Sequence, residues 1–222
     1  MTSLSSSTCE TRNRLIEAAG EVFAEQGFRN ATVRDICDRA GANLASVNYH
    51  FQSKEQLYAT VLRHAHGCSV DQYPPTCGLG QHATPRERLL AFVRSFLLRI
   101  FDTGRPAWFG KLMAREMVEP TAALDELVER GIRPQAQMLS EIVRSIVSDP
   151  VEDDLVRRCV ASIVGQCVFY HHARPVIERL YPEQAYQPSD IGQIAQHITQ
   201  FSYEALQHLR SGEQQNRAEV GS

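Results

Sequence analysis

A short stretch between Thr32 and Lys54 concentrates side chains that bind by hydrogen bonding. A run of small and polar residues ends there in Tyr49 and His50, and one of the two lysines of the chain, Lys54, follows shortly after it. Hydroxyl, amide and ammonium groups can donate or accept hydrogen bonds, so this stretch is the first candidate for a binding surface.

A second group, of histidines and cysteines, raises the question of a metal site: His64, His66, Cys68, Cys77 and His82. His64 and His66 are two apart, which places them on different faces of a helix, whereas a chelating pair needs a spacing of four. Cys167 and His171 have that spacing, but a core thiol beside a hydrogen-bonded histidine explains them as well. We expect no metal and no cofactor; a helical enzyme or a redox or metal sensor is the rival hypothesis.

A third group is aromatic and methionine-rich and lies between residues 92 and 171, in the predicted bundle. The one tryptophan, Trp108, follows a Gly-Arg-Pro turn at the start of a short helix. Short, broken helices leave gaps between longer ones, and such gaps accommodate small apolar ligands, although the same residues can also form an ordinary core. The residues that we assign to a ligand pocket are Phe92, Phe96, Trp108, Phe109, Met113, Glu116, Met138, Tyr170 and His171.

The composition is that of a globular protein: 222 residues, 43% hydrophobic and 22% charged, with a net charge of −3. No apolar run approaches the roughly 20 residues that span a bilayer, and the N-terminus lacks the pattern of a signal peptide, so we expect no membrane contact and a cytoplasmic location. The six scattered cysteines indicate reduced thiols. Because the chain is not basic, nucleic-acid binding must depend on where charges lie locally.

The spacing of apolar residues predicts helices nearly throughout, and no strand. Thr32, Asn43 and Ser53 each begin a predicted helix, and Gly27 and Gly41 each end one. Pro and Gly residues mark a loop over 67–83. The expected fold is therefore all-α, with a three-helix helix-turn-helix domain over 9–66 and a larger helical bundle over 84–211. The helices expected in the bundle are 86–101, 108–118, 121–147 with kinks at Gly131 and Pro134, 151–173, 175–180 and 189–210.

The two helices on either side of Gly41 have the pattern of a helix-turn-helix. Glycine at this position can adopt the positive φ that a sharp turn needs. We expect Leu44, Val47 and Phe51 to face inward from the second helix. Its small and polar residues would then face outward and fit a major groove about 12 Å wide.

The segment from Thr11 to Leu62 resembles the DNA-binding domain of the TetR family of bacterial repressors. The matching residues are Thr32-Val33-Arg34-Asp35-Ile36, Ala40-Gly41, Val47-Asn48-Tyr49-His50-Phe51 and Ser53-Lys54-Glu55-Gln56-Leu57. Two positions depart from the common pattern: Ala42 stands where Val is usual, and Gln52 where Gly or Pro often lies. A weaker resemblance, over 114–134, is to a subgroup of these regulators with a CerR-type C-terminal domain.

The resemblance implies that Lys54 binds a DNA phosphate, that Thr32 caps its helix and donates to another phosphate, and that Tyr49 and His50 contact the backbone. Arg34 would reach a phosphate or a guanine, and the base edges would be read by Asn43, Ala45, Ser46 and Asn48. Thr32 and Asn43 can instead act only as caps, and Tyr49 and His50 can instead pack within the domain. The acidic side chains of the first helix, Glu17, Glu21 and Glu25, would have to face away from DNA.

The resemblance also implies a homodimer that buries the last two long helices in a four-helix bundle. The residues that we assign to this interface are Val156, Val160, Ile163, Cys167, Ile194, Ile198, Phe201 and Ala205. The function expected is a ligand-responsive regulator of transcription, a repressor that binds a near-palindromic operator in double-stranded DNA as a dimer and is released by a small-molecule effector. A protein of this fold that binds another protein and ignores DNA is a further alternative.

Overall fold

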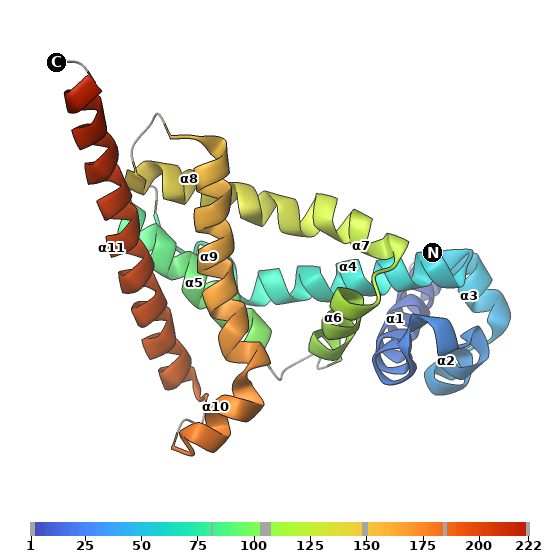
Figure 1. The fold of residues 1–222 in the computed structure, drawn as a ribbon. Helices are drawn as coiled ribbons and strands as arrows, with labels where there is room; N and C mark the ends of the chain where they lie inside the picture. The colour runs from blue at the N-terminus through green and yellow to red at the C-terminus, as the bar shows by residue number, and fades with distance from the viewer. Residues whose placement is uncertain (1–2, 81, 103–107, 148–150, 184–185, 221–222) are drawn as a thin grey trace. The chain divides into compact units, whose positions relative to one another are not determined.

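The computed structural model describes residues 3–80, 82–102, 108–147, 151–183 and 186–220, with side-chain surroundings between residues 8 and 209. Every regular element in this part of the chain is a helix, as Figure 1 shows, and the predicted all-α class is confirmed. The elements are α1 Ser3–Asn30, α2 Val33–Ala40, α3 Leu44–Phe51, α4 Lys54–Gln72, α5 Pro85–Phe101, α6 Phe109–Val118, α7 Ala122–Leu127, η1 Val128–Ile132, α8 Arg133–Val147, α9 Asp153–His172, α10 Arg174–Leu180 and α11 Pro188–Val220.

Most helix starts follow the predicted capping residues. Thr32 accepts a hydrogen bond from the backbone N–H of Asp35, and the Asp35 carboxylate accepts one from the backbone N–H of Thr32. Thr84 and Glu87 form the same reciprocal pair at the start of α5, with Pro85 as its first residue. These side chains satisfy backbone groups that a helix end leaves without partners.

Two predicted boundaries are wrong, and one is confirmed. Gly27 interrupts α1 as predicted, with a non-helical φ of 80° and ψ of 163°, and a further helical stretch continues to Asn30. Gly67 does not begin a loop, because α4 continues through it to Gln72 and keeps Ala65 and Ser69 buried. A single glycine costs a helix only about 1 kcal/mol, which such packing offsets. Finally, α11 extends to Val220, well beyond the predicted end at residue 210.

The predicted kink near Gly131 takes the form of a π-helical turn, η1, between α7 and α8. A Cβ on Gly131 would lie 2.9 Å from the imidazole of His66 on α4. The absence of a side chain at this position therefore allows η1 to lie closely against α4.

Packing divides the chain into two compact units, and this division differs from the predicted domain ranges. The first unit contains α1 to α4 together with α6, α7 and η1, although the sequence places the last three in the second domain. Its core includes Leu15, Phe23, Ile36, Val47 and Phe51, and it also includes Trp108 and Leu112 of the α6 segment.

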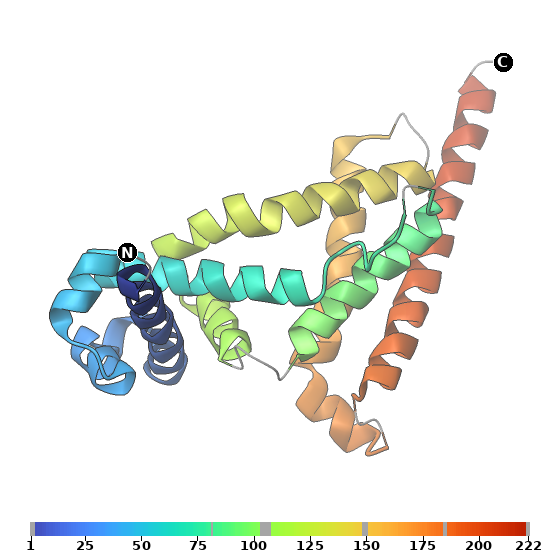
Figure 2. The same cartoon turned by 180° about the vertical axis from the view of Figure 1, so that it is seen from behind.

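The second unit contains α5 and α8 to α11. Figures 1 and 2 show α11 beside α9 and α5, and these three helices contact one another in pairs. Their apolar faces form one core that includes Leu89, Leu97, Leu139, Ile163 and Ile198. The residues between these positions face outward, as expected for amphipathic helices.

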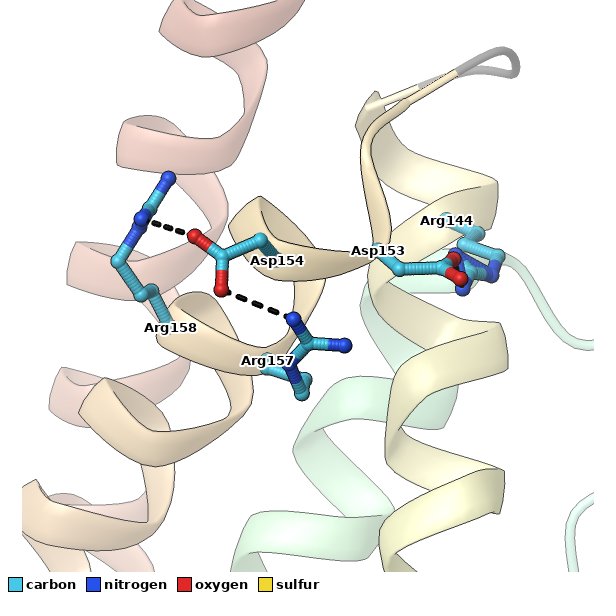
Figure 3. A network of polar contacts seen from close by, with 5 residues as sticks. All are labelled: Arg144, Asp153, Asp154, Arg157 and Arg158. Carbon is cyan, nitrogen blue, oxygen red and sulfur yellow. Dashed lines mark hydrogen bonds and ion pairs between the residues drawn. The ribbon is translucent and has the colours of Figure 1, made fainter.

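Surface ion pairs link the start of α9 to α8 and to its own first turns (Figure 3). Asp153 pairs with Arg144 of α8 at 2.5 Å, and Asp154 pairs with Arg157 at 2.9 Å and also with Arg158. Acidic residues in a first turn suit the positive end of the helix dipole. Because these pairs are largely exposed to water, each contributes about 1 kcal/mol or less to stability.

Candidate DNA-binding surface

A tight turn directs α3 away from α2. Gly41 has φ 59° and ψ 41°, a left-handed conformation, and the backbone N–H of Ala42 donates to the carbonyl of Cys37 at 3.0 Å. Asn43 then caps α3, because its side-chain oxygen accepts a hydrogen bond from the backbone N–H of Ser46 at 2.8 Å. The predicted helix-turn-helix therefore forms from the local signals that the sequence contains.

Two side chains anchor α3 to the core of the first unit. Val47 and Phe51 are both buried, and the guanidinium of Arg12 lies over the Phe51 ring at 5.6 Å. The helix ends at Gln52, which has φ 64° and ψ −44°. This is an unfavourable conformation for a residue with a side chain, at a position where the resemblance pointed to Gly or Pro.

The outward face of α3 consists of Leu44, Ala45, Asn48 and Tyr49, which we call the α3 face. Tyr49 is 77% exposed and Leu44 is 58% exposed. The prediction that Leu44 faces inward is wrong, since no neighbouring helix covers it among the described residues. An exposed leucine next to an alanine offers apolar contact of the kind that fits a thymine methyl group.

The polar residues of α3 differ in how many hydrogen bonds they can still make. The Asn43 oxygen accepts from both the backbone N–H and the hydroxyl of Ser46, so Asn43 has only its amide donors left for DNA. Asn48 is exposed, and its side chain makes no hydrogen bond within the described part of the chain. Because a bidentate contact to adenine needs a donor and an acceptor together, Asn48 suits it and Asn43 does not.

Three residues beside α3 are the predicted phosphate ligands. The hydroxyl of Thr32 donates to Asp35 at 2.7 Å, so its proton is already in use. Arg34 is exposed at the start of α2. The Lys54 ammonium donates to the carbonyl of Ala31 at 2.9 Å and lies 4.6 Å from the centre of the Phe28 ring. Lys54 thus also holds the segment between α1 and α2 in place.

His50 is half-buried between the rings of Tyr49 and Phe51, with centroid distances of 5.0 and 5.9 Å. This position lets the imidazole support the exposed Tyr49 ring. A direct contact of His50 with the DNA backbone stays a prediction.

The acidic residues of α1 have partners within the first unit. Arg39 of α2 pairs with Glu25 at 2.8 Å and with Glu21 at 3.7 Å, and the hydrogen bond from Arg39 holds the pKa of Glu25 below its usual value. Glu17 accepts a hydrogen bond from the Trp108 indole at 3.1 Å. The positive charge of Arg39 partly compensates the negative charge that Glu21 and Glu25 would present to a polyanion.

Helix α6 and the residue before it contact α1 at several points. The Trp108 ring lies directly against Gly20, where a Cβ would come within 2.2 Å of it. The Arg115 guanidinium donates to the carbonyls of Ala24 and Glu25, at 3.1 and 2.8 Å, next to the kink at Gly27. Sequence analysis did not find the role of Arg115, and no local pattern marks it.

Glu116 is buried and forms three hydrogen bonds inside the first unit. It accepts from the hydroxyl of Tyr58 at 2.7 Å and from the backbone N–H and hydroxyl of Thr121 at 3.1 and 2.8 Å. Burial, together with the bond to Glu116, raises the pKa of Tyr58. The carboxylate therefore joins α4 to the α6–α7 segment.

The residues predicted for the ligand pocket are divided between the two units, and their role in ligand binding stays a prediction. Trp108, Phe109 and Met113 pack on the core of the first unit, where Glu116 also lies, whereas the other five predicted residues lie in the second unit. Of these five, Phe92 is buried and Phe96, Met138 and Tyr170 pack against the second core. His171 is half-buried and stands edge-on to Phe101 at 5.7 Å; burial, followed by the charges of His172 and Arg174, lowers its pKa.

The predicted dimer residues differ in their burial, and their role in a dimer stays a prediction. Five of them are buried in the core of the second unit: Val156, Ile163, Cys167, Ile194 and Ile198. Val160 is half-buried, and Ala205 and Phe201 are exposed. The exposed apolar and small residues of α9 and α11 include Ala161, Gly165, Phe169, Phe201 and Ala205.

Within the described residues, no three His, Cys, Asp or Glu side chains lie close enough to hold a metal ion. Of the group of histidines and cysteines around residues 64–82, His64 and Cys68 are in contact, and their Nε2 and Sγ atoms lie 3.6 Å apart. Burial raises the pKa of Cys167 to about 12, so this thiol stays protonated. No helix in the described part of the chain is both long and apolar enough to cross a membrane.

Two family models match the chain. The model of the N-terminal domain of the bacterial TetR regulatory proteins matches residues 15–61, which contain α2 and α3. The model of the C-terminal domain of the HTH-type transcriptional dual regulator CecR matches residues 85–206, which corrects the label CerR to CecR.

Individual relatives agree with these models. CecR of Shigella flexneri is 26% identical, over 76% of this chain and 78% of its own length. The repressor KstR2 of Mycobacterium tuberculosis is 48% identical over 52 residues, which cover 23% of this chain and 26% of the relative. Its solved structure superposes with a TM-score of 0.58 at 20% identity, covering 87% of this chain and 93% of that one.

A further similar structure is that of AibR in complex with isovaleryl coenzyme A and operator DNA. It superposes with a TM-score of 0.59 at 16% identity, covering 85% of this chain and 96% of that one. At this identity the likeness concerns the fold alone.

Proposed function

Since this chain belongs to the TetR family of bacterial regulatory proteins and carries a CecR-type C-terminal domain, it is a transcriptional regulator, and we propose that it is a repressor. It binds a near-palindromic operator in double-stranded DNA as a homodimer, and a small-molecule effector releases it. It is not an enzyme and works in the cytoplasm, where its DNA lies. The observation that carries this proposal is the α3 face, on which an exposed tyrosine and an unengaged asparagine stand beside small and apolar residues.

In DNA recognition, the α3 face would contact base edges, and residues beside it would contact phosphates. Asn48 has both its donor and its acceptor available for a base edge, and Leu44 and Ala45 offer apolar contact. Tyr49, Arg34 and the N–H group that Lys54 does not use on the carbonyls of Arg29 and Ala31 serve the phosphates, together with the helix N-termini.

The surface of α9 and α11 supports a homodimer. Phe169 and Phe201 are 62% and 63% exposed, and a Cβ on Gly165 would meet no atom within 4 Å. Large apolar side chains next to small residues on a surface are typical of helix-packing interfaces. Two copies joined there would place two α3 helices on successive half-sites about 34–36 Å apart.

AibR supports the presence of an effector site, but not release itself, because its structure is a complex with both isovaleryl coenzyme A and operator DNA on a similar fold. Release then requires that the effector binds one conformation of the dimer more tightly than the DNA-binding one.

A binding selection tests the proposal. The purified full chain selects sequences from a pool of random duplexes, and fluorescence anisotropy measures its affinity for the enriched duplex. We expect a near-palindromic site, binding that weakens steeply with salt, and a loss of about tenfold or more in affinity for Tyr49→Ala. Tyr181→Ala is the matched control, because Tyr181 is also exposed but lies at the end of α10.

Lys54→Ala is examined in the same assay, with circular dichroism to show that the loss of the Ala31 contact leaves the fold intact. An unchanged affinity in Tyr49→Ala would remove the α3 face from DNA recognition. If no duplex is enriched at low salt while the chain stays helical, the alternative of a protein-binding module holds. Stoichiometric zinc binding that Cys167→Ser abolishes would support the metal sensor.

A further inference from the structure

A half-buried arginine in the second unit forms no ion pair with a carboxylate of the described residues. Arg99 of α5 donates through Nε to the carbonyl of Ser95 at 3.4 Å and through Nη1 to the side-chain oxygen of Gln135 on α8. Its third nitrogen, Nη2, is buried and has no hydrogen-bond partner in the described part of the chain. All the groups that Arg99 touches in this way are neutral.

The absence of a carboxylate sets Arg99 apart from the arginines of the second unit that form ion pairs. Arg144, Arg157, Arg158 and Arg174 pair with aspartate or glutamate near the surface, whereas no described carboxylate pairs with Arg99. Burial lowers the pKa of Arg99 to about 10, so it still carries its charge at neutral pH. A buried charge is costly unless an opposite charge accompanies it.

Aromatic side chains lie beside the guanidinium. Its Cζ atom is 5.5 Å from the centre of the Phe96 ring, and Phe96 stacks on Phe92 at 6.5 Å with an interplanar angle of 14°. Met138, one turn beyond Gln135 on α8, packs against the same core. The surroundings thus combine one unpaired positive charge with an apolar wall.

We propose that Arg99 is the anion-binding group of the effector site, and that the effector is an organic anion whose carboxylate or phosphate binds Arg99 while its apolar part packs beside Phe96. This inference rests on the proposed function and names the ligand class of its effector. A carboxylate or phosphate displaces the neutral oxygen of Gln135 from Nη1 and offers a second oxygen to Nη2. Such bidentate binding matches the planar geometry of guanidinium.

The test uses the thermal unfolding of the full chain with defined probes. Octanoate, benzoate and octyl phosphate are compared with the neutral octanamide, benzamide and octanol. We expect at least one anion to raise the Tm of the wild type by roughly 3–6 °C at ten times its Kd, and its neutral counterpart to do so much less. The carboxylate and phosphate probes show which of the two anions the site prefers.

Variants locate the effect at Arg99. The anion-dependent shift should vanish in Arg99→Gln and persist in Arg94→Gln, an exposed arginine on the same helix. Gln135→Glu places a carboxylate opposite Arg99, so it should raise the Tm of the protein alone and abolish the response to the anions. Arg99→Met should leave the Tm without ligand unchanged or higher, because it removes an unpaired charge while keeping the length of the side chain.

Each of three results would overturn the proposal. The first is that no anion shifts the Tm of the wild type more than its neutral counterpart, and the second is that Arg99→Gln keeps the shift. The third is that Arg99→Met unfolds more than about 5 °C lower without ligand, which would make Arg99 a structural link between α5 and α8. The affinity of Arg99→Gln for the selected duplex is measured in parallel. If this variant binds the duplex as tightly as the wild type but no anion effect is found, this inference fails while the proposed function stands.

Discussion

At the scale of single residues, the end of α3 carries local backbone strain. Gln52 ends α3 with a φ of 64° and ψ of −44°, a combination that side chains disfavour. Its backbone N–H nevertheless donates to the carbonyl of Asn48 at 3.1 Å and so closes the helix. A non-glycine residue in such a conformation costs of order 1–3 kcal/mol, which the packing of Val47 and Phe51 offsets.

We therefore predict that Gln52→Gly raises the free energy of unfolding by about 1 kcal/mol, since glycine relieves the strain but adds flexibility to the unfolded chain. Urea denaturation followed by circular dichroism measures the change. Gln193→Gly is the control, because Gln193 lies exposed inside α11 and its replacement should destabilise by about 1 kcal/mol. A loss of stability in Gln52→Gly would contradict the strain argument.

At the scale of elements, the notable contact is that of α6 with α1. Trp108 lies over Gly20, Arg115 holds the carbonyls of Ala24 and Glu25, and Glu116 bonds to Tyr58 of α4. A segment far along the chain thus completes the unit that contains α3. It follows that a fragment of residues 9–66 lacks part of its own core.

Gly20→Ala tests the fit between α1 and α6. Its Cβ would overlap the rigid Trp108 ring, so we expect a loss of about 1–3 kcal/mol in the free energy of unfolding, measured in urea. Gly110→Ala on α6 meets no atom within 4 Å and should be neutral or stabilising. In the double variant Gly20→Ala with Trp108→Leu, the two losses should not add, because the clash disappears. Additive losses would place the effect elsewhere.

At the scale of the whole molecule, the proposed operator binding depends on two chains acting together. Phe169 and Phe201 are exposed on the helices that we assign to the dimer, and these helices are further joined by a hydrogen bond from Gln166 to Ser202 at 3.1 Å. Joining two chains makes the second half-site contact intramolecular, so affinity for a palindrome far exceeds that for a half-site.

Phe201→Glu should therefore convert the dimer to a monomer in light scattering and weaken binding to the full operator by 100-fold or more, as estimated from effective concentrations. Binding to an isolated half-site should remain as weak as in the wild type. Leu180→Glu introduces the same charge at an exposed leucine of α10 and should keep the dimer. If Phe201→Glu remains dimeric, another surface joins the chains.

The sequence by itself determined the helices and the helix-turn-helix. Thr32, Gly41 and Asn43 act on backbone groups a few residues away, so their effect can be predicted without knowing the rest of the fold. CecR, at 26% identity, is a relative that matches this chain over both its N-terminal and C-terminal parts. The predicted DNA contacts and the remaining pocket residues stay predictions.

Only the tertiary structure decided which apolar faces are covered. In the folded chain Leu44 is exposed, whereas Cys167 and Ile198 are buried in the chain's own core. Trp108 packs in the first unit, and Arg99 has no carboxylate partner among the described residues. Helical periodicity shows which residues share a face, but what packs against that face depends on helices distant in the sequence. Burial and charge pairing are properties of the assembled neighbours, so local spacing cannot determine them.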